Sequence, residues 1–397
     1  MRSAGFHNAR LLMRRDSELS DKPIDYITLF VVVTLAMIGL VMVYASTYHL
    51  GIKYLKWQFG RAALGILVLY LGYRLNFHRL ADSRVRWVIL GIMVGLLGAA
   101  LIWGKVVGVT KRNILGVLQP AEFVKYLLVV WLAGYYADLK VSQGKRWWQR
   151  WNFRSALVVP GTVAAVVIGL TLAQPAVGTS AIMAAACLAI FFSAGVRRRY
   201  LVIAVVLVLV VLVLTVCFLP YATKRWHDWW AGTHYHQNQS LIAFGSGGPF
   251  GRGLGEGRQK FYFVPQLHKD FIFATVGEEF GFVGCLTVCI LYLILLFRGL
   301  RIGEEASSNF GFYLATGISV NMFLYAVVHM AVTLDLVPVT GQPLPFVSYG
   351  GSALVANLCA AGVLLKISKF KRKGLDEAVP GSRRYGWPRV PSARPGW

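Results

Sequence analysis

Acidic side chains are scarce in this sequence, with 17 Asp and Glu among 397 residues, so their positions can be weighed one at a time. Asp270 follows His268 and Lys269 and precedes the apolar run at 271–273. A carboxylate between cations and aromatic rings can be tuned as a proton acceptor, the role of a general base. On spacing alone, an Asp before an apolar run is favoured as the N-cap of a helix. Position leaves both interpretations open.

Three other carboxylates lie within apolar, helix-length segments. Glu122 precedes Lys125 by three residues, so the two side chains share one face of a helix. An internal salt bridge is the favoured interpretation of this pair, and a substrate-binding ion pair is the alternative. Glu278 and Glu279 are adjacent and follow Asp270 by about two helical turns. Because carboxylates in apolar helices are costly and are usually paired or functional, all of these residues are candidates for a site.

Two further patterns between 234 and 257 could bind ligands. Glycine recurs from Gly245 to Gly257, and such runs can expose backbone N–H groups to a phosphate. The run lacks the Gly-Lys-Ser/Thr ending of a Walker loop, so flexible packing is an equal interpretation. His234 and His236 could ligate a metal but have no third ligand nearby in the sequence, which favours surface residues over a metal site.

The chain that must position these residues has the composition of a membrane protein. It is 56% hydrophobic and 15% charged, with a mean hydropathy of +0.57. Apolar blocks recur along most of the chain at about 20 residues, the length that crosses a bilayer core. The fifth and sixth blocks are separated only by the Pro and Gly residues at 174–178. We predict an all-α polytopic membrane protein with ten transmembrane helices, near 27–46, 57–73, 87–104, 120–137, 155–173, 178–195, 200–219, 271–297, 308–333 and 349–366.

The positive charge of the chain follows this topology. The net charge is +24, and a cytoplasmic N-terminus places 28 Lys and Arg in inner segments, 11 in outer segments and two, Arg61 and Lys125, within helices. This asymmetry is the positive-inside bias, so both termini are expected in the cytoplasm. The basic clusters suit anionic membrane lipids as partners. Nucleic acid is not expected as a partner.

The sequence divides into three parts. Residues 1–26 form a basic cytoplasmic segment without the apolar core and cleavage site of a signal peptide. Residues 27–368 form one membrane domain, in which 220–270 is an extracytoplasmic loop between the seventh and eighth helices. A loop of this length is usually functional. Residues 369–397 form a basic tail rich in Pro and Gly, for which we predict disorder. The five cysteines lie within predicted helices and indicate no redox role.

Two long motifs occur in the second half of the chain. They are QSLIAFGSGGPFGRGLGEGRQKFYFVPQLHKDFIFATVGEEFGFVG from Gln239 to Gly284, and LVPVTGQPLPFVSYGGSALV from Leu336 to Val355. Both resemble the most diagnostic segments of the SEDS family (shape, elongation, division and sporulation). Weaker matches in the same order are GLVMVYAS at 39–46, LQPAEFVKYLLVVWLA at 118–133 and QPAVGTS at 174–180. The stretch from GEGRQKFYFVP to GEEFGFVG is closer to the division and sporulation members than to the elongation members.

The resemblance implies a peptidoglycan glycosyltransferase of the bacterial inner membrane that polymerises lipid II at the division septum. The implied partners are a class B penicillin-binding protein and other divisome membrane proteins. Asp270 falls on the aspartate of the family's HTDFIF motif, which implies that it is catalytic and reverses the N-cap interpretation. Arg112, Lys125 and Lys269 would neutralise the undecaprenyl diphosphate leaving group, with or without a divalent cation such as Mg²⁺ or Mn²⁺. The other expected substrate-binding residues are Glu122, His268, Glu278, Glu279, Ser348, Gly350, Gly351 and Ser352.

The sequence departs from the family pattern at four positions, Lys269 for Thr, Ala176 for Asp, Asn113 for Trp and Gln342 for Leu or Ile. Lys269 could hold the neighbouring acid ionised or bind diphosphate. The loss of a carboxylate at Ala176 leaves any role of that family aspartate in doubt here. Three alternatives to a septal polymerase stay open: an elongation-type polymerase, a catalytically weak division scaffold, and a lipid II transporter whose path is lined by Glu122, Lys125 and Glu278.

Overall fold

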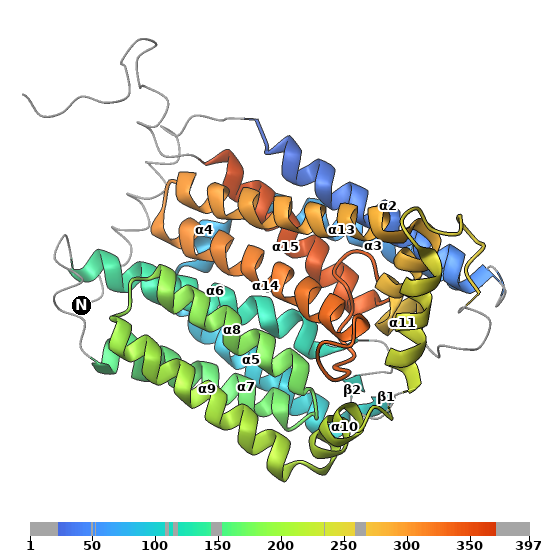
Figure 1. Ribbon diagram of the computed structural model, residues 1–397. Coiled ribbons are helices and arrows are strands. Elements are labelled where there is room, and N and C mark those ends of the chain that lie inside the picture. Colours follow the sequence, from blue (N-terminus) through green and yellow to red (C-terminus); the bar gives the residue numbers. More distant parts are fainter. Residues whose placement is uncertain are drawn as a thin grey trace, which may run out of the picture.

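The protein is a bundle of long helices (Figure 1). The computed structural model describes residues 23–48, 51, 53–107, 111–113, 118–143, 153–233, 235–258 and 267–370, with the backbone only at 105–107, 111–113, 140–143, 267 and 268. The basic N-terminal segment up to residue 22 and His234 lie outside the described residues. Of the tail 369–397, for which disorder was predicted, Lys369 is the last residue of α15, and the residues from 371 onward lie outside the described residues.

Each of the ten predicted ranges contains a long helix. These are α2 (Tyr26–Thr47), α3 (Lys53–Arg74), α5 (Ser83–Trp103), α6 (Pro120–Gln143), α7 (Val159–Leu172, continuing a π-helical turn at Arg154–Val158), α8 (Val177–Ser193), α9 (Arg198–Phe218), α13 (Ile272–Glu305), α14 (Asn309–Thr333) and α15 (Gly351–Lys369). The break between α7 and α8 confirms the predicted division at 174–178. The helical membrane fold class is confirmed, with one addition, a short antiparallel hairpin of β1 (Lys105–Val107) and β2 (Lys111–Asn113).

Length and composition alone identify seven membrane-spanning segments among the described residues: α2, α5, Arg154–Leu172, α9, α13, α14 and α15. The helix α8 is apolar but has 17 residues. Charged side chains reduce the apolar character of α3 and α6, among them Lys56 and Arg61 in α3 and Glu122 and Lys125 in α6. The number of ten spans and their orientation therefore stay predictions.

The largest differences from the prediction concern α13 and the segment 220–270. The helix α13 runs to Glu305, well past the predicted end at 297, because a helix can continue beyond the apolar stretch that a hydropathy pattern detects. The segment 220–270, predicted as a loop, contains the helices α10 (Pro220–Trp230) and α11 (Tyr235–Gly247) and the short helix α12 (Leu267–Asp270). The helices α10 and α11 and the β hairpin gather at one end of the bundle (Figure 1).

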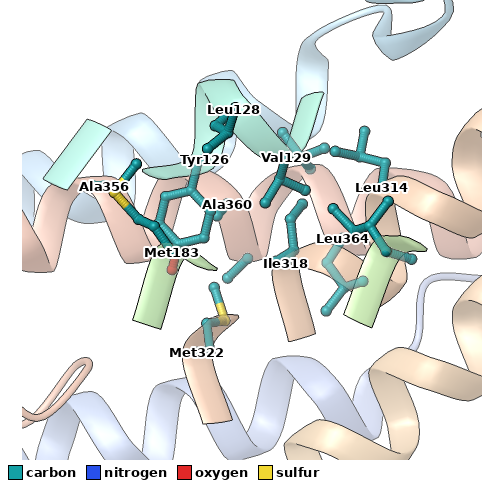
Figure 2. Packing of buried hydrophobic residues seen from close by; sticks show 14 of the residues in the cluster. Tyr126, Leu128, Val129, Met183, Leu314, Ile318, Met322, Ala356, Ala360 and Leu364 are labelled. Atoms are coloured by element: carbon teal, nitrogen blue, oxygen red, sulfur yellow. The ribbon is translucent and has the colours of Figure 1, made fainter. Parts of the chain in front are cut away.

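The centre of the bundle lies where α6, α8, α14 and α15 meet. Figure 2 shows Tyr126 and Val129 of α6 packed against Ile318 and Met322 of α14, with Ala360 of α15 beside them. Outside this centre, α3 and α15 run side by side at very close range. An added Cβ would come within 2.5 Å of the Cys359 carbonyl oxygen at Gly72, and within 2.1 Å of the Leu69 carbonyl oxygen at Gly362. Small residues permit such close approach between membrane helices.

A non-helical segment between α14 and α15, which we call the buried segment (334–350), runs into the bundle. Leu344, Phe346 and Val347 are almost fully buried there, and Phe346 has φ of 67°. Irregular backbone at membrane depth is tolerated only where protein surrounds it and satisfies its polar groups. The Tyr292 hydroxyl of α13 donates to the carbonyl oxygen of Pro345, which satisfies one of them.

The contact between α3 and α15 generates a test of packing. Gly362→Ala places a methyl group against the Leu69 carbonyl, so we expect a loss of about 1–3 kcal/mol in unfolding free energy from overpacking. Gly91→Ala is the matched control, because the added methyl at this exposed position of α5 has no neighbour within 4 Å. Thermal unfolding in detergent, measured as the loss of the monodisperse protein peak in size-exclusion chromatography, should separate the two variants. Equal melting temperatures would contradict the packing.

Candidate functional site

Asp270 is the last residue of α12, at the junction with α13. The N-cap position of α13 is held by Phe271, whose side chain makes no capping hydrogen bond, so Asp270 does not cap the helix. The N-cap interpretation is therefore wrong. Asp270 is half-buried, and its Oδ1 atom is inaccessible to solvent and has no hydrogen-bond partner among the described residues. The structure thus leaves a carboxylate oxygen unsatisfied at this junction.

The amphipathic helix α10 brings a cation towards this carboxylate. Arg225 donates a hydrogen bond from Nη1 to the Val339 carbonyl oxygen, and its guanidinium carbon lies 4.4 Å from the centre of the Tyr221 ring. Burial lowers the pKa of Arg225, while electrostatic interactions with Tyr221 and Asp270 oppose that shift.

Glu122 and Lys125 form an ion pair in the interior of the bundle, as their spacing predicted. Nζ of Lys125 lies 2.7 Å from Oε2 of Glu122, and the side chains are 0% and 1% exposed. The ammonium group is also 3.7 Å from the centre of the Tyr325 ring of α14, a cation–π contact. Oε1 of Glu122 is buried without a hydrogen-bond partner among the described residues. The pair links α6 to α14.

Glu278 and Glu279 are buried beneath the glycine-rich loop. The Arg258 backbone N–H donates to Oε1 of Glu278 at 2.6 Å, and a Cβ at Gly257 would come within 2.8 Å of Oε2 of Glu278. The N–H groups of Arg252 and Gly253 donate to the backbone carbonyls of the two glutamates, each at 3.0 Å. The loop thus packs against the first turns of α13 and stabilises them. Among the described residues, the glycines of the loop serve this packing.

The glycine-rich loop also meets a kink in α13. Gly281 has φ of 65° and ψ of −159°, a conformation that L side chains rarely adopt. The Phe282 N–H, released by the kink, donates to the Gly248 carbonyl at 2.9 Å. A Cβ at Gly251 would lie 2.1 Å from the Glu279 carbonyl oxygen, so both glycines are required by close backbone approach.

Arg61 of α3 lies beside the start of α15, where four of the predicted residues are found. Its guanidinium carbon lies 4.4 Å from the centre of the Tyr349 ring, and a Cβ at Gly351 would be 3.0 Å from its Nε. Gly350 is the N-cap of α15. The Ser352 hydroxyl accepts the Gln119 N–H at 3.0 Å, and the Ser348 hydroxyl oxygen accepts the Leu344 N–H at 2.8 Å. A cation and a helix N-terminus, both favourable to an anion, thus lie together.

An apolar cavity of about 570 Å³ opens between α2, α3 and the glycine-rich loop. Lys56 is the cationic residue in its lining. The other lining residues are apolar or aromatic: Leu40, Val41, Tyr44, Leu55, Phe59 and Leu254.

Two predicted site residues are seen only in part. Arg112 lies on β2 with its backbone opposite Val106, and His268 lies in α12 two residues before Asp270, but the description of both is limited to the backbone. Lys269 is half-buried beside Asp270. Among the described residues, no three His, Cys, Asp or Glu side chains are grouped so as to hold a metal ion.

Comparison with known proteins identifies the family. A family model described as "Cell cycle protein", FtsW/RodA/SpoVE, matches residues 26–373. The chain belongs to this family. It is 34% identical over 366 residues to the probable peptidoglycan glycosyltransferase FtsW of Geobacter metallireducens, covering 87% of this chain and 94% of that protein. It is 32% identical to the stage V sporulation protein E of Bacillus subtilis, covering 88% of this chain and 98% of that protein. The family predicted from the motifs is confirmed.

Solved structures share the fold of this family member. A chain from a peptidoglycan synthase complex, studied for its coordination of polymerization and crosslinking, is 26% identical with a TM-score of 0.71, covering 88% of this chain and 99% of that chain. The crystal structure of the rod shape determining protein RodA from Thermus thermophilus is 24% identical with a TM-score of 0.65, covering 88% and 97% of the two chains. At 24% identity, the likeness to RodA shows a shared fold and nothing about activity.

Sequence reasoning about this family member did not anticipate the contacts of two cations, Arg61 and Arg225. Arg61 was recognised only as a charge inside a helix, and that rarity is itself a signal of function. Arg225 carried no such signal, because it is one of several basic residues in the segment before α12. Its relation to Asp270 depends on α10 folding back onto the buried segment at Val339.

The ion pair of α6 generates a prediction about stability. Glu122→Gln and Lys125→Met each leave one charge buried alone, so we expect a loss of about 3–5 kcal/mol for each. The double variant Glu122→Leu/Lys125→Met removes both charges, and we expect it to unfold near the wild-type temperature in the same detergent. A double variant as unstable as the sum of the two single variants would contradict the assignment of Glu122 and Lys125 as each other's charge partner.

Proposed function

We propose that this protein is a peptidoglycan glycosyltransferase that polymerises lipid II into glycan strands for septal wall synthesis. The observation that carries the proposal is the Asp270 carboxylate, exposed in part and unsatisfied at Oδ1, on a chain that belongs to the FtsW/RodA/SpoVE family. The activity named for the FtsW relatives and the likeness to a chain of a peptidoglycan synthase complex support it.

The proposed reaction uses Asp270 as the general base. Its carboxylate accepts the proton of the acceptor sugar 4-hydroxyl while that oxygen forms a bond to the anomeric carbon of the donor. The bond between the anomeric carbon and the diphosphate oxygen breaks, and undecaprenyl diphosphate leaves with the bonding electron pair. A positioned base contributes about 100- to 10,000-fold to such a step, and alignment of two membrane-anchored substrates supplies much of the remainder.

Cations on three elements would receive the diphosphate. Lys269 lies next to the base, and Arg61 lies at the N-terminus of α15 beside Gly350 and Gly351. Arg112 remains a proposed contributor on the strength of the motif. Lys125 differs from these, since its ammonium is fully buried against Glu122, and we assign the pair a role in holding the bundle. Glu278 and Glu279 likewise support the glycine-rich loop.

The apolar cavity between α2 and α3 suits a polyprenyl tail. Its walls are apolar, and Lys56 supplies a positive charge in the lining, as an anionic lipid with a long hydrocarbon chain requires. In the predicted orientation, the C-terminal end of α2 and the N-terminal end of α3 face outward, so the tail would lie in the outer leaflet. The same orientation places both termini in the cytoplasm.

The described residues around Asp270 do not form a set of ligands for a divalent cation. Mg²⁺ and Mn²⁺ prefer several oxygen ligands. The charged neighbours of Asp270 that the structure describes are the cations Lys269 and Arg225, which fit a metal ion poorly. We therefore derive no step through a metal ion, and metal dependence stays a prediction from the diphosphate chemistry alone.

The proposed partner is a class B penicillin-binding protein that crosslinks the glycan strands. The likeness to a chain of a peptidoglycan synthase complex supports a transpeptidase partner. Other divisome membrane proteins and anionic lipids complete the proposed surroundings. The protein would lie in the bacterial inner membrane at the division septum.

Asp270→Asn tests the proposed reaction. We expect glycan synthesis from lipid II, by purified protein with its transpeptidase partner, to fall about 100- to 10,000-fold, because the amide cannot accept the proton. Glu256→Gln is the matched control, since it removes an exposed carboxylate of the glycine-rich loop. Glycan chains would be resolved by gel electrophoresis at equal protein levels.

Three outcomes of this experiment count against the proposal. Unchanged glycan chains in Asp270→Asn would contradict the assignment of Asp270 as the general base. Lipid II movement across vesicles by wild type without any polymer would favour transport. If wild type shows neither polymerisation nor lipid II movement, and the septum still assembles in cells carrying Asp270→Asn, a scaffold role would be favoured.

A further inference from the structure

The helix α10 presents two kinds of side chain on its exposed side. Trp226 and Trp230 are 43% and 84% exposed, and their spacing of four residues places them one above the other along one edge of that side. Lys224 and His227 are also exposed, and a helix of 3.6 residues per turn places them towards the other edge. An aromatic edge next to a basic edge is typical of helices that lie in the plane of a membrane surface.

The other side of α10 is fixed to the protein. Arg225 and Trp229 each donate a hydrogen bond to the buried segment (334–350). The acceptors are the carbonyl oxygen of Val339 and, at 2.9 Å from Nε1 of the indole, Oδ1 of Asp335. These bonds set the rotation of the helix about its axis, so the tryptophan edge and the basic edge have a defined direction.

The preceding helix, α9, indicates what surrounds the exposed side. It has 21 residues, is apolar enough to cross a membrane, and exposes most of its side chains, among them Leu207, Leu214 and Phe218. The helix α10 begins two residues after Phe218, at one end of the bundle (Figure 1). Because the exposed apolar surface of α9 must face the hydrocarbon core, α10 follows at the depth where the core meets the lipid headgroups.

We propose that the exposed side of α10 binds anionic phospholipids of this leaflet, with the Trp226 and Trp230 rings at the top of the acyl chains and the Lys224 ammonium at the phosphate groups. Indole rings favour the membrane interface, and one basic side chain near an anionic lipid surface increases affinity about fivefold. Nδ1 of His227 lies 4.0 Å from Oδ1 of Asp228, so these two groups offset each other and Lys224 supplies the charge. In the predicted orientation this is the outer leaflet.

Lipid bound on this surface would also stabilise part of the buried segment. A ligand that binds the ordered form of α10 lowers the population of its locally unfolded form. The hydrogen bonds of Arg225 and Trp229 break when α10 unfolds, so residues 335–339 share its stability. This inference does not depend on the transfer of sugars, and its tests need no lipid II.

Hydrogen exchange of the full chain in nanodiscs tests the preference for anionic lipid. We expect the amides of α10 and of residues 335–339 to exchange about fivefold more slowly in phosphatidylcholine discs that contain phosphatidylglycerol than in phosphatidylcholine alone. Lys224→Gln should remove this difference and leave exchange in phosphatidylcholine unchanged. Arg252→Gln is the matched control, because it removes an exposed cation outside α10, and it should keep the difference.

Fluorescence quenching tests the position of the aromatic edge. Trp230→Phe removes one exposed indole, so the difference in emission between this variant and wild type reports the Trp230 ring. We expect phospholipids brominated near the headgroup to quench this difference more strongly than phospholipids brominated near the chain ends. Iodide in the aqueous phase should quench it weakly, because the ring lies among lipid.

Three outcomes overturn the inference. Strong quenching of Trp230 by iodide, with none by brominated lipid, would place the ring in water and favour a protein partner for this surface. Equal exchange of α10 in the two kinds of disc would exclude a preference for anionic lipid. A lipid dependence that persists in Lys224→Gln would exclude this ammonium as the contact. The comparison of the two discs uses wild type, so it decides the lipid preference even if a variant fails to fold.

Discussion

Non-helical backbone inside a membrane bundle must have its polar groups satisfied by protein, and the buried segment (334–350) imposes that requirement on its neighbours. Side chains from four helices meet it. Arg225 of α10 binds the Val339 carbonyl, Gln237 of α11 binds that of Val337 at 2.8 Å, Tyr292 of α13 binds that of Pro345, and Nδ1 of His329 in α14 lies 2.7 Å from that of Gln342. The segment therefore fixes the relative positions of helices that are distant in sequence. It also ends at Gly350, where α15 begins beside Arg61.

Two carboxylates of the protein, those of Glu122 and Asp270, have different surroundings. Glu122 and Lys125 satisfy each other in the interior, and their burial makes them a connection between α6 and α14. Asp270 has a carboxylate oxygen that no described group satisfies, at a helix junction that is partly open. Oε1 of Glu122 is likewise unsatisfied among the described residues, so the two carboxylates differ in their exposure and in the cation that lies beside Glu122.

The departure at Gln342 has a local physical account. Its amide oxygen accepts a hydrogen bond from the Thr179 hydroxyl at 3.2 Å, close to the start of α8, and a Cβ at Gly178 would come within 3.1 Å of its Nε2. Ala176, where the family pattern has an aspartate, is the N-cap residue of α8 and offers no side-chain cap. The polar glutamine therefore joins the buried segment to α8 near the position at which the carboxylate is missing. The structure offers no account of Asn113, which lies on the short hairpin.

The sequence by itself determined the helical membrane fold, the positions of the ten long helices and the family, because apolar length and ordered motifs are local properties of a chain. It also identified Asp270 by resemblance, although local spacing alone favoured a cap. Tertiary structure decided that α13 begins one residue too late for Asp270 to cap it, that the glycines serve the kink at Gly281, and that Glu278 lies under a loop. It also placed Arg225 against the buried segment and Arg61 beside the start of α15. These outcomes depend on contacts between segments distant in sequence, whose energies no local pattern records.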